Sequence, residues 1–178
     1  MNVSEIDKLH LQIIRKNVED FLFQCASSYD MCDTQLLEIA PQIHEGAKAF
    51  FTKTTISTLD IDSSSGADFI ADICQDNSAI ISAESFDYIV CTEVLEHTLN
   101  PFCAVDEIYR ILRKNGKAFI TVPFNFRIHG PLPDCWRFTE YGLKELFKKF
   151  KILALEKIDT TDRDLMPIQY TLIVEKGD

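Results

Sequence analysis

The segment "FDYIVCTEVLEHTLNPFCAVDEIYRILRKNGKAFITVP", residues 86–123, decides the fold class of this chain. Its first seven residues are rich in aromatic and β-branched side chains, which predicts a strand. The stretch "NPFCAVDEIYRILRKNG" predicts a helix, because Asn100 can cap it and Pro101 suits its first position, while Asn115 and Gly116 suit its exit. The closing "KAFITVP" predicts another strand. This alternation indicates an α/β sheet with helices on both faces.

The rest of the chain continues the alternation of strands and helices. Strands are predicted at 34–40, 54–62, 67–73, 151–158 and 168–176, and helices at 4–23, 43–51 and 139–150. With the two strands of the central segment this gives seven strands. The last two are joined by "DTTDRDLMP", which contains no helix, so we expect an antiparallel pair. Only about seven residues, "IDSSSGA", span the junction between the second strand and the third, which leaves no room for a covering helix.

Length, composition and charge limit the classes of function. The 178 residues predict one domain, 1–178, with an N-terminal helical segment at 1–33 and an α/β core at 34–178. The net charge of -10 argues against a nucleic acid or an anionic membrane as the main partner. No apolar run approaches the roughly 18 residues of a membrane span, and no signal peptide is recognisable.

The six cysteines include no C-x-x-C pair. We interpret them as reduced thiols of a cytoplasmic protein, and we predict neither a disulfide framework nor a metal site. The oligomeric state is left open.

The segment 86–123 closely resembles the fourth strand, following helix and fifth strand of class I S-adenosylmethionine-dependent methyltransferases. The stretch "HGPLPDCWRFTEYGLKELF", 129–147, resembles a loop and helix of small bacterial members of that family. The resemblance covers roughly residues 34–176. It implies a Rossmann-like, doubly wound, mostly parallel seven-stranded sheet whose last strand is antiparallel. It also implies S-adenosylmethionine as the cofactor.

The resemblance assigns the end of the first predicted strand, "LLEIAPQ", to the cofactor. Glu38 takes the acidic position that helps to fix the cofactor's amino-acid end, and Ala40 stands where the family's first glycine usually is. Pro41 is expected to stiffen the turn and to push Ala40 toward an extended backbone. No glycine follows until Gly46, so a plain strand and turn is the alternative interpretation.

Further cofactor contacts are implied at the ends of later strands. Asp60 matches the position that accepts from the ribose hydroxyls, with Asp62 as the alternative. Asp72 matches the position that accepts from the adenine amino group, although a loop aspartate can equally bind its own backbone. The full set of implied cofactor residues is Glu38, Ala40, Asp60, Ile61, Asp72, Ile73, Cys91, Thr92 and Glu93.

The loop 129–137 is the candidate for recognition of the methyl acceptor. His129 is the first candidate for a general base and Asp134 the second. The alternative is a structural plug in which Trp136 packs inward and Arg137 pairs with Asp134. His97 is expected to be a packed or capping residue.

The leading hypothesis is methyl transfer to a small polar acceptor, with O-methylation of a sugar or glycan precursor as its most specific form. Methyl transfer from a sulfonium requires no metal ion. The alternative is a non-catalytic, methyltransferase-like binding or scaffold protein. A nicotinamide-dependent oxidoreductase is disfavoured, because the G-x-G-x-x-G fingerprint is absent.

Overall fold

The computed structural model describes residues 3–41 and 45–177, and within them seven strands form one sheet. The strands are β1 Gln35–Ile39, β2 Thr55–Asp60, β3 Phe69–Ile70, β4 Phe86–Thr92, β5 Leu112–Pro123, β6 Lys151–Thr160 and β7 Arg163–Glu175. Their order is β3-β2-β1-β4-β5-β7-β6. Strands β1 to β5 pair in parallel, whereas β7 is antiparallel to both β5 and β6. The mostly parallel sheet with an antiparallel last strand is therefore confirmed.

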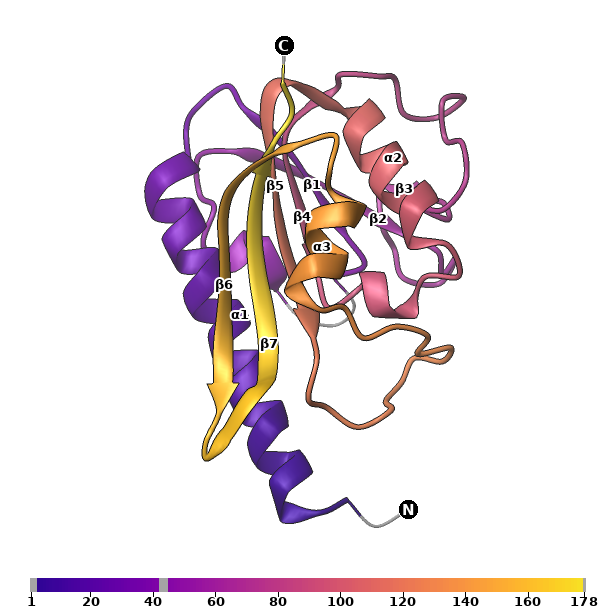
Figure 1. Ribbon diagram of the computed structural model, residues 1–178. Coiled ribbons are helices and arrows are strands. Elements are labelled where there is room, and N and C mark those ends of the chain that lie inside the picture. Colours follow the sequence, from indigo (N-terminus) through magenta and orange to yellow (C-terminus); the bar gives the residue numbers. More distant parts are fainter. Residues whose placement is uncertain (1–2, 42–44, 178) are drawn as a thin grey trace.

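Helices cover both faces of the sheet. The α-helices are α1 Glu5–Tyr29, α2 Pro101–Ile111 and α3 Glu140–Leu146, and the short 3-10 helices are η1 Gly46–Ala49 and η2 Leu95–His97. Figure 1 shows α1 on one side of the sheet and α2 and α3 on the other. The predicted helix at 43–51 falls partly outside the described residues, and its described part contains only η1.

The alternation of side chains along the strands builds a separate core on each face. Leu36 packs with Leu22 of α1, whereas its neighbour Leu37 belongs to the cluster that contains Ile108 of α2 and Leu143 of α3. Successive strand residues point to opposite faces, so one strand serves both layers. Both faces are buried, as expected of a central parallel strand.

Helix α2 begins as predicted and ends earlier. The Asn100 side chain accepts from the backbone N–H of Cys103 at 3.2 Å. The predicted exit at Asn115 and Gly116 is wrong, because α2 ends at Ile111 and β5 begins with the next residue. Gly116 lies inside β5, where a Cβ would come within 2.9 Å of the Asp87 carbonyl oxygen. The glycine is needed for a close approach between strands rather than for a helix cap.

Helix α1 extends beyond its predicted end to Tyr29. The carboxylate of Asp30, directly after the helix, accepts hydrogen bonds from the backbone N–H groups of Thr52, Lys53 and Thr54. These bonds tie the end of α1 to the start of β2.

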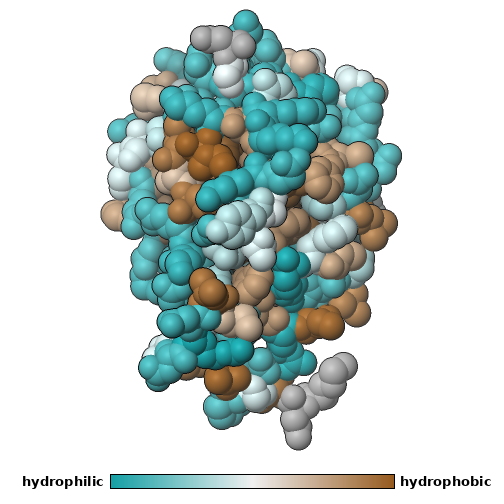
Figure 2. All heavy atoms as spheres, in the orientation of Figure 1, coloured by the Kyte–Doolittle hydropathy of each residue, from teal (hydrophilic) through white to brown (hydrophobic). Residues whose placement is uncertain are grey.

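Two of the outer elements are shorter than predicted, because α3 ends at Leu146 and the third strand does not fill 67–73. β3 contains only Phe69 and Ile70, consistent with the short connection from β2. On the face drawn in Figure 2, hydrophobic side chains form separated spots among hydrophilic ones. No helix within the described ranges is long and apolar enough to cross a membrane.

Candidate active site

The chain order of the sheet reverses between β1 and β4, which lie side by side. In open α/β sheets, ligands bind at the carboxyl ends of the strands at such a switch point. Ala40 and Glu93 directly follow these two strand ends, and their φ values are 51° and 54°. Left-handed backbone is uncommon for residues other than glycine and often marks a functional site.

The extended backbone expected for Ala40 is therefore wrong. The Ala40 N–H donates to the Leu59 carbonyl oxygen of β2 at 2.7 Å. This hydrogen bond continues the β1–β2 pairing by one residue, and the chain turns there in spite of the following proline.

The side-chain carboxyl group of Glu38 lies directly against the backbone at Gly46. Its side chain is buried, and its Oε1 accepts from the backbone N–H of Ala47 at 2.9 Å, whereas Oε2 has no hydrogen-bond partner within the described residues. Gly46 has a φ of 54°, and a Cβ on it would lie only 2.0 Å from Glu38 Oε1. Gly46 thus allows a close approach of the backbone to the Glu38 carboxyl group, which a side chain at this position would block.

Glu38 and Asp60 line the same cavity of about 170 Å³, together with Lys48 and residues of the loop after β2. Burial raises the pKa of Glu38 to about 7, although the Ala47 N–H and Lys48 act in the opposite direction. Asp60 Oδ1 accepts from the backbone N–H of Asp62 at 2.9 Å. Asp62 instead binds Ser64 through its own carboxylate, so Asp60 is the better-placed partner for a ligand.

The other residues that the resemblance assigned to the cofactor lie in varied environments. Cys91 and Ile73 belong to the hydrophobic core, whereas the Ile61 side chain is exposed to solvent. Asp72 accepts from the backbone N–H of Cys74 at 2.8 Å, the local hydrogen bond that was the alternative interpretation. Thr92, the last residue of β4, is partly exposed.

Glu93 is oriented by the sheet. Its Oε1 accepts from Thr121 Oγ1 of β5 at 2.8 Å and from Gln169 Nε2 of β7 at 2.7 Å. Gln169 in turn accepts from Asn17 of α1. Burial raises the pKa of Glu93 to about 7, while the hydrogen bonds from Gln169 and Thr121 oppose this shift.

The loop between β5 and α3 is fastened to η2 and its flank. The backbone N–H groups of Cys135 and Trp136 both donate to the Glu96 carbonyl oxygen, at 2.7 and 3.1 Å. The indole Nε1 of Trp136 donates to the Thr98 carbonyl oxygen at 2.8 Å. These contacts hold the loop beside the end of β4.

An ion pair braces the same loop internally. Arg137 donates from both terminal nitrogens to the two carboxylate oxygens of Asp134, and also to the Arg127 carbonyl oxygen at 3.0 Å. This is the pairing named in the structural-plug alternative. Trp136, however, remains 40% exposed, so the indole does not pack fully inward.

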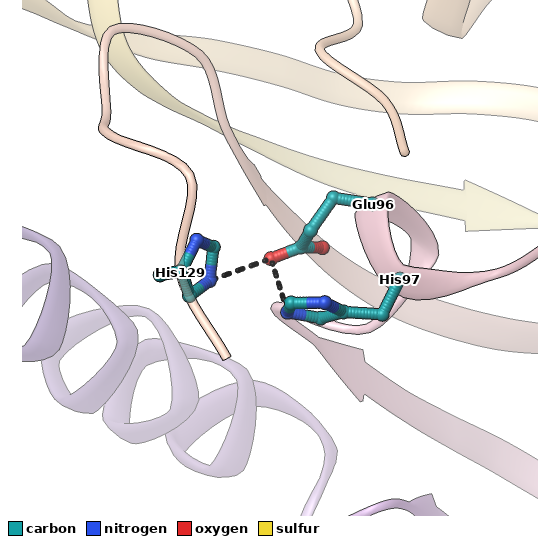
Figure 3. A group of neighbouring side chains, drawn as sticks. All are labelled: Glu96, His97 and His129. Atoms are coloured by element: carbon teal, nitrogen blue, oxygen red, sulfur yellow. Dashed lines mark ion pairs between the residues drawn. The ribbon is translucent and has the colours of Figure 1, made fainter. Parts of the chain in front are cut away.

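Glu96, His97 and His129 converge at the junction of η2 and this loop, as Figure 3 shows. Glu96 is fully buried, and neither of its carboxylate oxygens has a hydrogen-bond partner within the described residues. Its Oε1 lies 3.7 Å from Nε2 of each histidine. The sequence interpretation did not bring these three side chains together. The sequence feature that could have suggested this cluster was the Glu-His pair directly after β4, together with His129 in the loop after β5.

The two histidine rings are held through their other nitrogens. His97 Nδ1 lies 3.0 Å from the Pro133 carbonyl oxygen, and His129 Nδ1 lies 3.0 Å from Asp134 Oδ2. Acceptors at both Nδ1 atoms favour a proton there and leave the Nε2 lone pairs facing Glu96.

Burial lowers the pKa of His129, although Asp134 acts in the opposite direction. For Asp134, burial favours the neutral form, but Arg137 and the His129 N–H outweigh it and bring the pKa to about 2. Burial, followed by the nearby Glu93, raises the pKa of Glu96 well above its ordinary value. At neutral pH, His129 is therefore suited to accept a proton, and Asp134 is suited to orient it.

Fold and site together define an S-adenosylmethionine-dependent methyltransferase of the α/β type. Residues 17–158 match the family described as a methyltransferase domain, and the chain belongs to that family. S-adenosylmethionine is its cofactor. No curated protein matches the sequence.

Solved structures share the fold at low sequence identity. A protein from Methanosarcina mazei described as an S-adenosylmethionine-dependent methyltransferase matches at 15% identity and a TM-score of 0.63, with 85% of this chain and 96% of that chain covered. The PH0226 protein from Pyrococcus horikoshii matches at 15% identity and a TM-score of 0.67, with 92% and 91% covered. The YcgJ protein from Bacillus subtilis matches at 12% identity and a TM-score of 0.67, with 90% and 99% covered. At these identities the similarity establishes the fold alone.

Proposed function

We propose that this methyltransferase transfers the methyl group to a hydroxyl of a small polar acceptor, such as a sugar or glycan precursor, in the cytoplasm. The observation that carries the proposal is the imidazole of His129, held at Nδ1 by Asp134 beside the end of β4. A hydroxyl acceptor benefits from a base, whereas the net charge of -10 argues against a nucleic-acid acceptor.

The residues present fit the cofactor at the β1–β2 end of the sheet. Glu38 Oε2, which has no hydrogen-bond partner within the described residues, suits the ammonium of the cofactor's amino-acid end, and Asp60 suits the ribose hydroxyls. The cofactor supplies a methyl group bound to a sulfonium. The neutral thioether that remains after the transfer is a good leaving group. The chain has to hold the acceptor in line with the methyl and exclude water.

In this proposal His129 takes the acceptor's hydroxyl proton at Nε2. Asp134 keeps the Nδ1 proton in place, and Arg137 keeps Asp134 ionised and fixed. Asp134 is thus a positioning residue rather than an alternative base, because its carboxylate is already engaged.

The test is a panel of acceptors with detection of S-adenosylhomocysteine, comparing sugars, nucleotide sugars, small amines and RNA. We expect turnover with a hydroxyl-bearing sugar derivative. In His129→Ala, turnover with that acceptor should fall by about 10²–10⁴, while S-adenosylhomocysteine binding is retained. Turnover confined to amines or RNA would overturn the proposal.

A further inference from the structure

Three potential metal-ligand atoms converge on one point. They are Glu96 Oε1 and the Nε2 atoms of His97 and His129, and all three lie within 4.8 Å of one another. Both Glu96 oxygens lack a hydrogen-bond partner within the described residues, although the side chain is completely buried. A buried carboxylate without a partner is costly, so a positively charged ligand is expected to complete it.

The orientation of the histidines points to the same ligand. Histidines that bind metals characteristically donate their other ring N–H to a carboxylate or a backbone carbonyl. His129 has Asp134 Oδ2 at 3.0 Å from Nδ1, and His97 has the Pro133 carbonyl oxygen at the same distance. Both Nε2 lone pairs then face Glu96, an arrangement that repels unless a cation or a proton lies between them.

The distances suit an ion of ordinary size. Two ligands about 2.1 Å from a tetrahedral metal are about 3.4 Å apart. Each imidazole Nε2 is 3.7 Å from Glu96 Oε1, and the three ligand atoms lie within 4.8 Å of one another, so the histidines would have to approach each other by about 1 Å to bind one ion. The exposed fractions of the histidine side chains are 14% and 23%, so an ion could enter from their side.

We propose that Glu96, His97 and His129 form a binding site for one divalent transition-metal ion, such as Zn²⁺ or Mn²⁺. Two imidazoles and one carboxylate favour these ions over Mg²⁺ or Ca²⁺, which prefer oxygen ligands. Three protein ligands leave at least one position open for water or for an acceptor hydroxyl. With the ion bound, His129 Nε2 is a ligand and no longer accepts a proton. The ion would instead lower the pKa of a bound acceptor hydroxyl, whose proton would pass to solvent.

The experiment is calorimetric titration of the full chain, stripped with EDTA, with Zn²⁺, Mn²⁺ and Mg²⁺ in the absence of S-adenosylmethionine. It measures neither methyl transfer nor cofactor binding, so its result is independent of the proposed function. We expect one Zn²⁺ or Mn²⁺ per chain, and at least a 100-fold loss of affinity in Glu96→Gln and in His129→Gln. Cys135→Ser is the control for metal capture by the exposed thiol on the same loop, and its affinity should be unchanged.

Thermal melts test whether a variant loses metal affinity only because it has unfolded. In EDTA, Glu96→Gln should melt close to the temperature of the parent, because the amide has nearly the same size and replaces a carboxyl group that has no hydrogen-bond partner within the described residues. With metal added, the parent should gain stability and the variant should not. If Glu96→Gln does not fold, His129→Gln and His97→Gln decide. Absence of binding at millimolar metal, or undiminished binding in the folded ligand variants, would overturn the proposal.

Discussion

Glu38 is a buried carboxyl whose folded-state pKa of about 7 exceeds its ordinary value of 4.5, chiefly through burial. A raised pKa means that the folded protein binds the proton more tightly than the unfolded chain does. Its contribution to stability is present below pH 4.5 and is lost as the pH rises through about 7. We predict that Glu38→Gln gains stability over the parent as the pH rises from 4.5 to 8, by at most about 3 kcal/mol.

Urea denaturation at several pH values measures this difference. The exposed Glu156→Gln is the matched control, and its difference from the parent should stay flat. A flat profile for Glu38→Gln would show that burial does not disfavour the Glu38 carboxylate.

Asp60 and Asp62 stand two residues apart, but only Asp60 lines the cavity that contains Glu38. We predict that Asp60→Asn weakens S-adenosylhomocysteine binding by about 10- to 100-fold, the cost of one charge-assisted hydrogen-bond partner. Asp62→Asn, the matched control, should bind nearly as the parent does. Calorimetric dissociation constants decide, and equal losses would mean that the ribose is held elsewhere.

At the scale of elements, the loop between β5 and α3 depends on Arg137. Its guanidinium reaches both oxygens of the fully buried Asp134 carboxylate as well as a backbone carbonyl. Lysine cannot form this planar fork. We predict that Arg137→Lys lowers the free energy of unfolding by about 1–3 kcal/mol. Chemical denaturation is the measurement.

Arg113→Lys is the control for this prediction, because Arg113 pairs with Asp87 at 2.6 Å but is 43% exposed. Exposed pairs contribute about 1 kcal/mol or less, so its effect should be small. If the two variants lose equal stability, the Asp134–Arg137 pair does not brace the loop.

Most elements could be predicted from the sequence, and each difference has a specific structural cause. Periodicity located all seven strands, because burial on one or two faces leaves an apolar pattern. The end of α2 was misplaced, because Asn115-Gly116 has the composition of a helix exit, whereas Gly116 serves a close approach between β5 and β4. The extent of α1 depends on Asp30 and the distant N–H groups of residues 52–54, which no local pattern reveals.

At the scale of the whole molecule, the site was less predictable than the fold. Glu38 and Asp60 could be placed together because adjacent parallel strands end at the same edge of the sheet. The relation of Gly46 to Glu38 depends on how a loop returns over the sheet. The cluster of Glu96, His97 and His129 depends on the path of a loop 32 residues further along the chain than His97. The spacing of residues in the sequence carries no information about the path of either loop back to the site.

The test that involves the whole fold is its response to S-adenosylhomocysteine, the product that the cofactor leaves after methyl transfer. We predict that S-adenosylhomocysteine at about 100 times its dissociation constant stabilises the fold by roughly 2.7 kcal/mol. For a chain of this size that corresponds to a melting temperature about 5–10 °C higher. The measurement belongs at pH 8, where Glu38 is ionised. NAD should produce no shift, and Asp60→Asn should need a higher concentration for the same effect. If millimolar S-adenosylhomocysteine leaves the melting temperature unchanged while the protein remains folded, the cavity at Glu38 and Asp60 does not hold the cofactor.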